Sequence, residues 1–381
     1  LSGQFLNGGM ARMPQAVETL AAFGLAYGIV GLLAGILTQA RQFGLVLIEH
    51  DQGYRTVFRF GIAAGLSLSG MVALLAWTPA GSWLIADLHG VSPALTEVVL
   101  LAFAWFVPFP LVRSLTRIYI GTLLRIRRSD IPAYGSGGGI GLSILTVFIL
   151  LPVDFVRQDP ILLPVLATWA GALAEFAIVL WGHRRYVRFE TQGEAAPLDM
   201  SYVLHFFWPL ALIMAVQSGT RPLINVFIAG AADGTEALAV LTVVYALGHI
   251  PYGWLNEVRN LPSAFRDCND LPKIRRFIAG CGLVSLAWMG AVFWTPALDH
   301  ILLHWVGVSP ALAAHCGVPL MIFTGFPIVV CLRGYIHGIG LLQHRTRAMA
   351  PSAPSRIVTV VLVLSALSGQ DLHGATRATI A

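Results

Sequence analysis

The chain has 381 residues, of which 56% are hydrophobic and only 11% charged, with a mean hydropathy of +0.74 and a net charge of +5. Soluble domains carry about a quarter charged residues, so this composition excludes an ordinary soluble protein and predicts a polytopic membrane protein. The four cysteines have no CxxC spacing, which argues against a disulfide framework and a zinc site. We expect no nucleic-acid partner, no cofactor and no bound metal.

Runs of about twenty apolar residues predict ten transmembrane helices and a shorter stub over residues 1–11. The ten predicted spans are 17–40, 57–78, 95–122, 138–155, 160–183, 202–230, 236–257, 275–297, 311–341 and 355–369. The sequence therefore predicts an all-α membrane protein.

Arginine concentrates in alternate loops, which hold most of the 24 positive residues. These loops are 41–59, 123–137, 184–201, 258–276 and 342–356. By the positive-inside rule we expect these loops, and the start of the chain, to face the cytoplasm of a cell that carries the protein in its plasma or inner membrane.

The two halves of the chain repeat each other. The hexapeptide GVSPAL at 90–95 recurs at 307–312, an offset of 217, and the WTP at 77–79 recurs at 294–296 with the same offset. Upstream the offset is 218, as for Asn7 with Asn225. So many aligned identities indicate an internal duplication.

A duplication of six spans per repeat predicts two six-helix lobes of parallel orientation. We assign residues 1–186 to the N-terminal lobe, 187–201 to a cytoplasmic linker and 202–381 to the C-terminal lobe. By the repeat, the first helix is clipped and the twelfth is missing from this chain, because ATRATIA at 375–381 does not read as a span.

Arg221 lies near the middle of an apolar segment, with Gln217 one helical turn before it and Asn225 one turn after. Residues four apart share a helix face, so these three predict one polar stripe. A charge at that depth costs roughly 3 kcal/mol on insertion scales and usually faces a bundle interior or a water-filled pathway. A structural arginine tied to backbone carbonyls or a carboxylate is the alternative.

Three more arginines lie inside predicted spans, and the repeat matches none of the four to another arginine. These are Arg113, Arg117 and Arg333, whose counterparts are Val330, Gly334 and Thr116, while the counterpart of Arg221 is Gly3. The shared scaffold therefore does not require them, and we expect them to attract anions into the membrane interior. If the fourth span ends early, Arg113 and Arg117 are instead interfacial positive residues.

Several other polar residues are candidates for the same cavity. Glu175 lies mid-helix and is expected to pair with a buried arginine or to carry a proton. His249 and Tyr252 flank Pro251, which we expect to break the eighth span, and Glu257 follows them. Asn7 is included because it repeats Asn225.

Three further patterns are weaker. His300 and His304 have metal-like spacing but lack a third ligand. The run GSGGGIG at 135–141 follows no strand and carries no lysine, so we interpret it as a loop leading into the fifth span. No GxSxG, HExxH or Ser–Lys pattern is present, which predicts that the protein is not an enzyme.

The segments WPLALIMAVQSGTRPLINVFIAG (208–230), TEALAVLTVVYALGHIPYGWLNEVR (235–259) and LHGAT (372–376) resemble the progressive ankylosis protein family, as does AVETLAAFGLAYG (16–28). The resemblance implies a fold like that of the multidrug, oligosaccharidyl-lipid and polysaccharide (MOP, MATE-like) exporters. It also implies export of multivalent anions such as pyrophosphate, ATP or other nucleotides, and citrate. Where animal members have a basic residue after the first-helix asparagine, this chain has Gly8.

We therefore predict a monomeric exporter that works by alternating access and holds its anion in a central cavity. The predicted substrate residues are Arg221, Gln217, Asn225, Arg113, Arg117, Arg333, His249, Tyr252 and Asn7, with Glu175 and Glu257 for coupling or ion pairing. One alternative is a lipid-linked oligosaccharide or polysaccharide flippase, or a multidrug exporter, of the same superfamily. Another is a regulator that binds an anion without transporting it.

Overall fold

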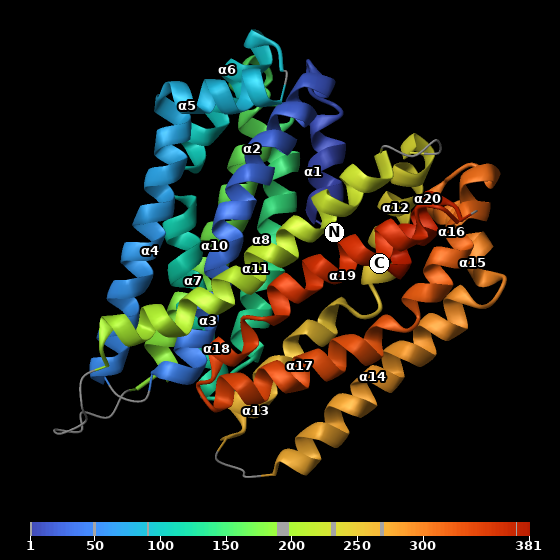
Figure 1. Cartoon of the computed structure of the whole chain (residues 1–381). Coiled ribbons are helices and arrows are strands. Elements are labelled where there is room, and N and C mark those ends of the chain that lie inside the picture. The colour runs from blue at the N-terminus through green and yellow to red at the C-terminus, as the bar shows by residue number, and fades with distance from the viewer. Residues whose placement is uncertain are drawn as a thin grey trace. The chain divides into compact units, whose positions relative to one another are not determined.

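The structure is a computed structural model that describes residues 2–48, 51–89, 91–188, 198–229, 234–266, 270–370 and 372–381. These residues are almost entirely helical and divide into two compact units, Leu1–Ala211 and Leu212–Ala381. The linker predicted at 187–201 falls mostly outside the described residues, so the predicted lobe boundaries stay a prediction. Figure 1 shows the helices of each unit with their labels.

The first unit contains α1 (Ser2–Met10), α2 (Ala16–Ile36), η1 (Leu37–Gln39), α3 (Ala40–Gln42), η2 (Phe43–Leu47), α4 (Asp51–Trp77), α5 (Pro79–Ser82), η3 (Trp83–Leu88), α6 (Pro93–Phe106), α7 (Phe109–Arg125), α8 (Asp130–Leu150), α9 (Asp154–Gln158), α10 (Leu162–Tyr186) and the first part of α11 (Met200–Ala229). The second contains the rest of α11, α12 (Gly234–His249), η4 (Gly253–Asn260), α13 (Leu261–Ala264), α14 (Leu271–Phe293), α15 (Ala297–His300), η6 (Ile301–Val306), α16 (Pro310–Phe323), α17 (Phe326–Leu342), α18 (Thr346–Met349), α19 (Ser352–Leu367) and α20 (Gly374–Ile380).

Among the described residues, 8 helices are long and apolar enough to cross a membrane, or up to 10 if each bent pair counts as one span. The ten agree with the ten predicted spans. The bent pairs are α6 with α7, at 41°, and Glu236–His249 with Gly253–Ala264, at 50°. Prolines 108 and 251 lie in the two breaks, and proline interrupts a helix because it has no N–H to donate and its ring clashes with the preceding turn.

The repeated sequence motifs form matching local structures in the two units. Ser92 caps α6 by accepting a hydrogen bond from the Leu95 amide, and Ser309 caps α16 in the same way through the Leu312 amide. A proline follows each serine, where its fixed φ suits the first helical turn. The offset of 217 also joins Arg127 and His344, which both have positive φ (61° and 56°). The duplication therefore extends into the loop after α7 and α17.

Each unit has its own apolar core, and the two cores use corresponding positions. In the first unit Phe103 and Phe106 on α6 are fully buried against α2. In the second unit Leu320 and Phe323 on α16, 217 residues later, are buried against α12. In a membrane, where lipid tails are as apolar as these side chains, such contacts stabilise each helix pair through close van der Waals packing.

The loop predicted at 135–141 is wrong, because this run lies inside α8. Its glycines allow close contact with α10: a Cβ built on Gly139 would lie 2.7 Å from the Gly171 carbonyl oxygen, and one on Gly171 would lie 2.9 Å from the Gly139 oxygen. Glycine weakens a helix in water but favours close helix packing in a membrane, where backbones must approach each other. The run is a packing surface.

Some predicted boundaries are also displaced. The loop expected at 41–59 is largely helical, because α4 begins at Asp51, and the loop expected at 342–356 ends early, because α19 begins at Ser352. ATRATIA, which does not read as a span, forms the short helix α20. Because α19 begins at Ser352, Arg356 belongs to a helix and not to a loop.

Candidate functional site

The first unit encloses a cavity of about 290 Å³ between α1, α2, α7, α8 and α10. Arg113 and Arg117 reach it from α7 and Glu175 from α10. The two arginines are four residues apart, so they share one face of the helix. The helix α7 continues to Arg125, and both side chains line the cavity.

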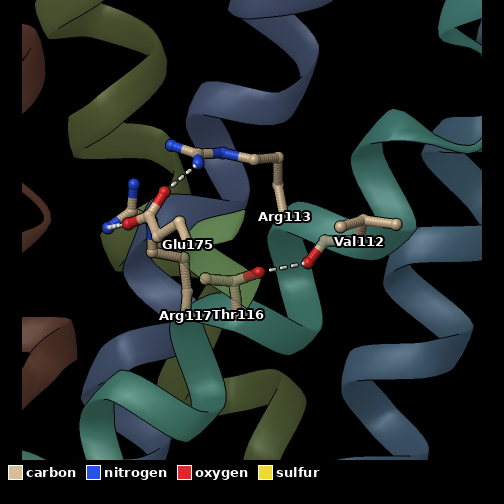
Figure 2. A network of polar contacts seen from close by, with 5 residues as sticks. All are labelled: Val112, Arg113, Thr116, Arg117 and Glu175. Atoms are coloured by element: carbon tan, nitrogen blue, oxygen red, sulfur yellow. Dashed lines mark hydrogen bonds and ion pairs between the residues drawn. The ribbon is translucent and has the colours of Figure 1, made fainter. Parts of the chain in front are cut away.

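Glu175 joins the two arginines, as Figure 2 shows. Its Oε2 accepts a hydrogen bond from Arg113 Nη1 at 2.6 Å, and its Oε1 lies 3.6 Å from Arg117 Nη1. The Glu175 side chain is 10% exposed, against 24% and 19% for the arginines. Two guanidinium groups thus share one carboxylate, which leaves this cluster of three with one excess positive charge.

The neighbouring Thr116 takes no part in this cluster. Its hydroxyl donates to the Val112 carbonyl one turn earlier in α7, at 2.7 Å, so its hydrogen-bonding capacity is used within the helix (Figure 2). This matters for the comparison of the two units, because Thr116 stands where the other unit has Arg333.

The second unit encloses a larger cavity, of about 450 Å³, between α11, α12, α17, α19 and α20. Gln217 on α11, Tyr245 on α12, Arg333 and His337 on α17 and Arg356 on α19 supply most of its polar groups. None of the residues described as lining it has an aspartate or glutamate side chain. The volume falls in the range of about 300–1,000 Å³ that is typical of small-molecule pockets.

Arg333 is positioned by a neutral group. Its Nη2 donates to Asn256 Oδ1 at 3.0 Å, and Asn256 Nδ2 donates to the Gly253 carbonyl at 2.9 Å, which fixes the orientation of the amide. Across the part of the chain that the structure describes, no carboxylate lies within salt-bridge distance of Arg333 or Arg356. Both charges therefore stay available to a ligand.

Two tyrosines lie beside these arginines. Tyr245 lines the cavity together with Arg333 and Arg356, and the Tyr252 ring packs against two other lining residues, Phe323 and Phe326, with ring centroids 6.2 Å and 5.7 Å apart. The Arg221 guanidinium also stacks over the Tyr245 ring, with its Cζ 4.4 Å from the ring centroid. Arg221 therefore lies next to a tyrosine that lines the cavity of the second unit.

The repeat shows that the two cavities occupy corresponding places. Their shared lining positions are Leu6 with Ile224, Tyr27 with Tyr245, and Phe109 with Phe326. Their charges differ, however: Arg113 corresponds to Val330, and Arg356 corresponds to Gly139 at the same offset of 217. The scaffold therefore provides the pocket, and each half has acquired its own arginines.

Comparison with known protein families and solved structures identifies proteins that this chain resembles. The family model for the progressive ankylosis protein (ANKH) matches residues 1–295. The chain belongs to the ANKH family. Among solved structures, it is similar to an outward-facing MATE transporter of the MOP superfamily, with 16% identity and a TM-score of 0.72 over 100% of this chain and 86% of that one. It is also similar to a MOP superfamily transporter from Pyrococcus furiosus described as having a binding pocket of reverse polarity, with 13% identity and a TM-score of 0.70 over 100% and 87% of the two chains.

This ANKH family member therefore has the fold of the MATE transporters and is a multi-pass membrane protein, as the sequence predicted. At such low identity the likeness shows the fold alone. Which substrate the protein takes has to be argued from its own residues.

The predicted polar stripe on α11 is only partly gathered at a cavity. Gln217 lines the cavity of the second unit, Arg221 lies over Tyr245, and Asn225 is exposed. Asn7, the counterpart of Asn225 on α1, is exposed as well. Both asparagines stay predictions as ligand-binding residues.

The residues around Pro251 are close to the arginines but point in several directions. The His249 ring is exposed and lies edge-on to the Tyr252 ring, 5.1 Å between centroids. Glu257 is exposed and accepts a hydrogen bond from Asn260 Nδ2 at 2.8 Å. Glu257 is thus part of a local contact at the end of η4, and its coupling role stays a prediction.

Sequence reasoning overlooked Arg356 and Tyr245. Arg356 was counted among the positive residues of a cytoplasmic loop, although it lies one residue inside the last predicted span. Tyr245 carries a usable signal, since it repeats Tyr27 at the offset of 218 and both tyrosines line a cavity. A comparison of the two halves position by position identifies both.

Proposed function

We propose that the protein is a membrane transporter that exports multivalent anions by alternating access, with pyrophosphate, nucleotides such as ATP, and citrate as the candidate substrates. The observation that carries the proposal is the cavity of the second unit, which Arg333 and Arg356 both line and to which the described lining adds no aspartate or glutamate side chain. A pair of unneutralised cations is costly inside a membrane and is retained where an anion visits.

The chemistry of the lining suits phosphates and carboxylates. A guanidinium group presents parallel N–H donors that match two oxygens of such an anion, and it keeps its charge at physiological pH. Tyr245 and Gln217 add neutral donors on the same cavity. A multivalent anion contacting both Arg333 and Arg356 would balance their charge, whereas an organic cation would add to the repulsion. The basic lining therefore argues against a multidrug exporter of cations.

The first unit supplies a second, weaker anion site in this proposal. Arg113 and Arg117 already share Glu175, so a substrate anion has to compete with a carboxylate that the protein provides itself. The excess positive charge still attracts an anion, but the competition lowers its affinity. In this proposal the substrate binds only transiently at the first-unit site and more tightly at the second-unit site.

The remaining candidates have supporting roles in the proposal. Arg221 raises the positive potential near Tyr245, and His249 and Tyr252, on either side of Pro251, are in ring contact with each other. Relative movement of the two units would open the pathway to either side of the membrane, as in transporters built from repeated bundles.

The test is flux through the purified protein in proteoliposomes. Liposomes with and without the protein are loaded in turn with labelled pyrophosphate, ATP, citrate or an organic cation such as ethidium, and efflux is measured. The proposal predicts release of at least one multivalent anion and none of the cation. Release of the cation alone would identify a multidrug exporter. Binding of an anion without flux would identify a regulator. Scrambling of a lipid-linked pyrophosphate without release of any soluble anion would identify a flippase. Each of these three outcomes would contradict the proposal.

A further inference from the structure

Three potential metal ligands come together in the second unit, and none of them lines the cavity described above. Glu236 lies in the first turn of α12, His315 in the second turn of α16, and His373 directly precedes α20. One ligand atom from each side chain lies within 4.8 Å of those of the other two. The three helices α12, α16 and α20 contact one another pairwise, as Figure 1 also shows.

One pair of these groups, Glu236 and His315, has a spacing close to that of a tetrahedral metal site. His315 Nε2 lies 3.5 Å from Glu236 Oε1, which is long for a hydrogen bond. Ligands about 2.0–2.2 Å from a tetrahedral zinc ion are separated from one another by roughly 3.4 Å. The rings of His315 and His373 are stacked with centroids 4.3 Å apart and planes 13° apart, so at least one ring has to turn out of the stack for both to bind one ion.

We propose that Glu236, His315 and His373 bind a divalent transition-metal ion of the Zn²⁺ class, with the fourth position open to water or an external ligand. Two imidazole nitrogens and one carboxylate favour zinc, cobalt or nickel over magnesium and calcium, which prefer oxygen ligands only. Glu236 and His315 are 46% and 44% exposed, so an ion can reach the site from outside the unit.

Ligation has a local cost. The Ala375 amide donates to His373 Nδ1 at 3.3 Å, a long contact that caps α20. Metal binding at Nδ1 would use that lone pair, and binding at Nε2 would place the ring proton on Nδ1, so the contact is given up in either case. A hydrogen bond of this length contributes little, and the coordination of one ion by three side chains outweighs it.

The repeat argues that the cluster is not part of the shared scaffold. Glu236 corresponds to Glu18 on α2, but His315 corresponds to Val98 on α6, so the first unit cannot form the same site. Glu18 is an exposed acid at a matching helix position, which makes it the control. In the predicted topology this end of α12 faces away from the cytoplasm, so the ion would come from outside the cell and join α12, α16 and α20.

The experiment uses the full chain, purified without a histidine tag and treated with chelator, and titrates it with Co²⁺ and Zn²⁺. Tetrahedral Co²⁺ has characteristic visible absorption, so this readout is independent of transport. We expect saturable Co²⁺ binding displaced by Zn²⁺, at least about tenfold weaker in Glu236→Gln and His315→Ala and unchanged in Glu18→Gln. His300→Ala is a second control, because His300 stacks on His304, 4.5 Å between centroids, as a separate histidine pair.

Melting curves in the absence of metal show whether each variant is folded. Zn²⁺ should raise the melting temperature of the wild-type protein, which has all three ligands, but not that of Glu236→Gln or His315→Ala. The absence of saturable Co²⁺ binding to the wild-type protein would overturn the proposal. Equal loss of binding in His300→Ala and His315→Ala would also overturn it, because the ion would then lie elsewhere.

Discussion

Arg333→Gln removes a positive charge from the second-unit cavity, where the neutral side-chain amide of Asn256 accepts a hydrogen bond from Arg333. Arg333 lines the cavity and donates to Asn256 Oδ1 at 3.0 Å, with no carboxylate partner among the described residues. A hydrogen bond to a charged group contributes about 1.5–3 kcal/mol, and about 1.4 kcal/mol corresponds to a tenfold change in affinity. We therefore expect the Kd for pyrophosphate to rise by about 10- to 100-fold.

The assay is isothermal titration calorimetry of the purified protein in detergent. Arg347→Gln is the matched control, because it makes the same charge change in the same unit at an exposed position of α18 that does not line the cavity. Arg333→Lys should lie between wild type and Arg333→Gln, since it keeps the charge but loses the planar fork of donors. A Kd that is equal in wild type and Arg333→Gln, with melting temperatures also equal, would refute the assignment of the cavity.

Two further predictions concern the first unit. Glu175→Gln leaves Arg113 and Arg117 without their shared carboxylate, so the melting temperature should fall by the equivalent of about 1–3 kcal/mol and recover with added pyrophosphate. The exposed Glu97→Gln is the control and should leave the melting temperature unchanged with and without pyrophosphate. An unaltered melting curve for Glu175→Gln would contradict the role of the carboxylate. Gly139→Val should destabilise the α8–α10 contact by about 3 kcal/mol or more and reduce the yield of folded protein. Gly141→Val is the control and should be tolerated, because its Cβ would meet no atom within 4 Å. Equal yields of the two variants would show that the two helices do not require this close approach.

The spans and the repeat were predictable from the sequence because both depend on local patterns. An apolar run long enough to cross the bilayer becomes a helix, since the backbone has no other way to satisfy its hydrogen bonds there. Serine followed by proline marks the starts of α6 and α16 in the sequence itself. The breaks at Pro108 and Pro251 follow from the same kind of local rule.

The glycine run in α8 was not predictable in this way. Glycine lowers helix propensity, so GSGGGIG reads as a loop until Gly139 is seen against the Gly171 carbonyl. That contact joins residues on two different helices, and no pattern within the run itself reveals it. The helical state of this segment is decided by its packing partner.

The sequence indicated several of the residues that line the two cavities, and the pairing of Glu175 with a buried arginine, but not Arg356 or Tyr245. The burial cost of a charge singled out Arg113, Arg117, Arg333 and Glu175, and the structure brings three of them together in the first unit. The same reasoning could not bring Arg333 and Arg356 together, because tertiary packing decides which helices line a common cavity. It also could not show that Asn256, a neutral residue, is the group that positions Arg333.

The measurement that tests the central claim most directly is efflux of labelled pyrophosphate from proteoliposomes that contain equal amounts of wild-type protein, the double variant Arg333→Gln/Arg356→Gln, or Arg347→Gln. The account predicts efflux by the wild type and by Arg347→Gln, and efflux near that of protein-free liposomes for the double variant. Wild-type efflux in the double variant would contradict it, because the anion would then cross the membrane without the two arginines of the second-unit cavity.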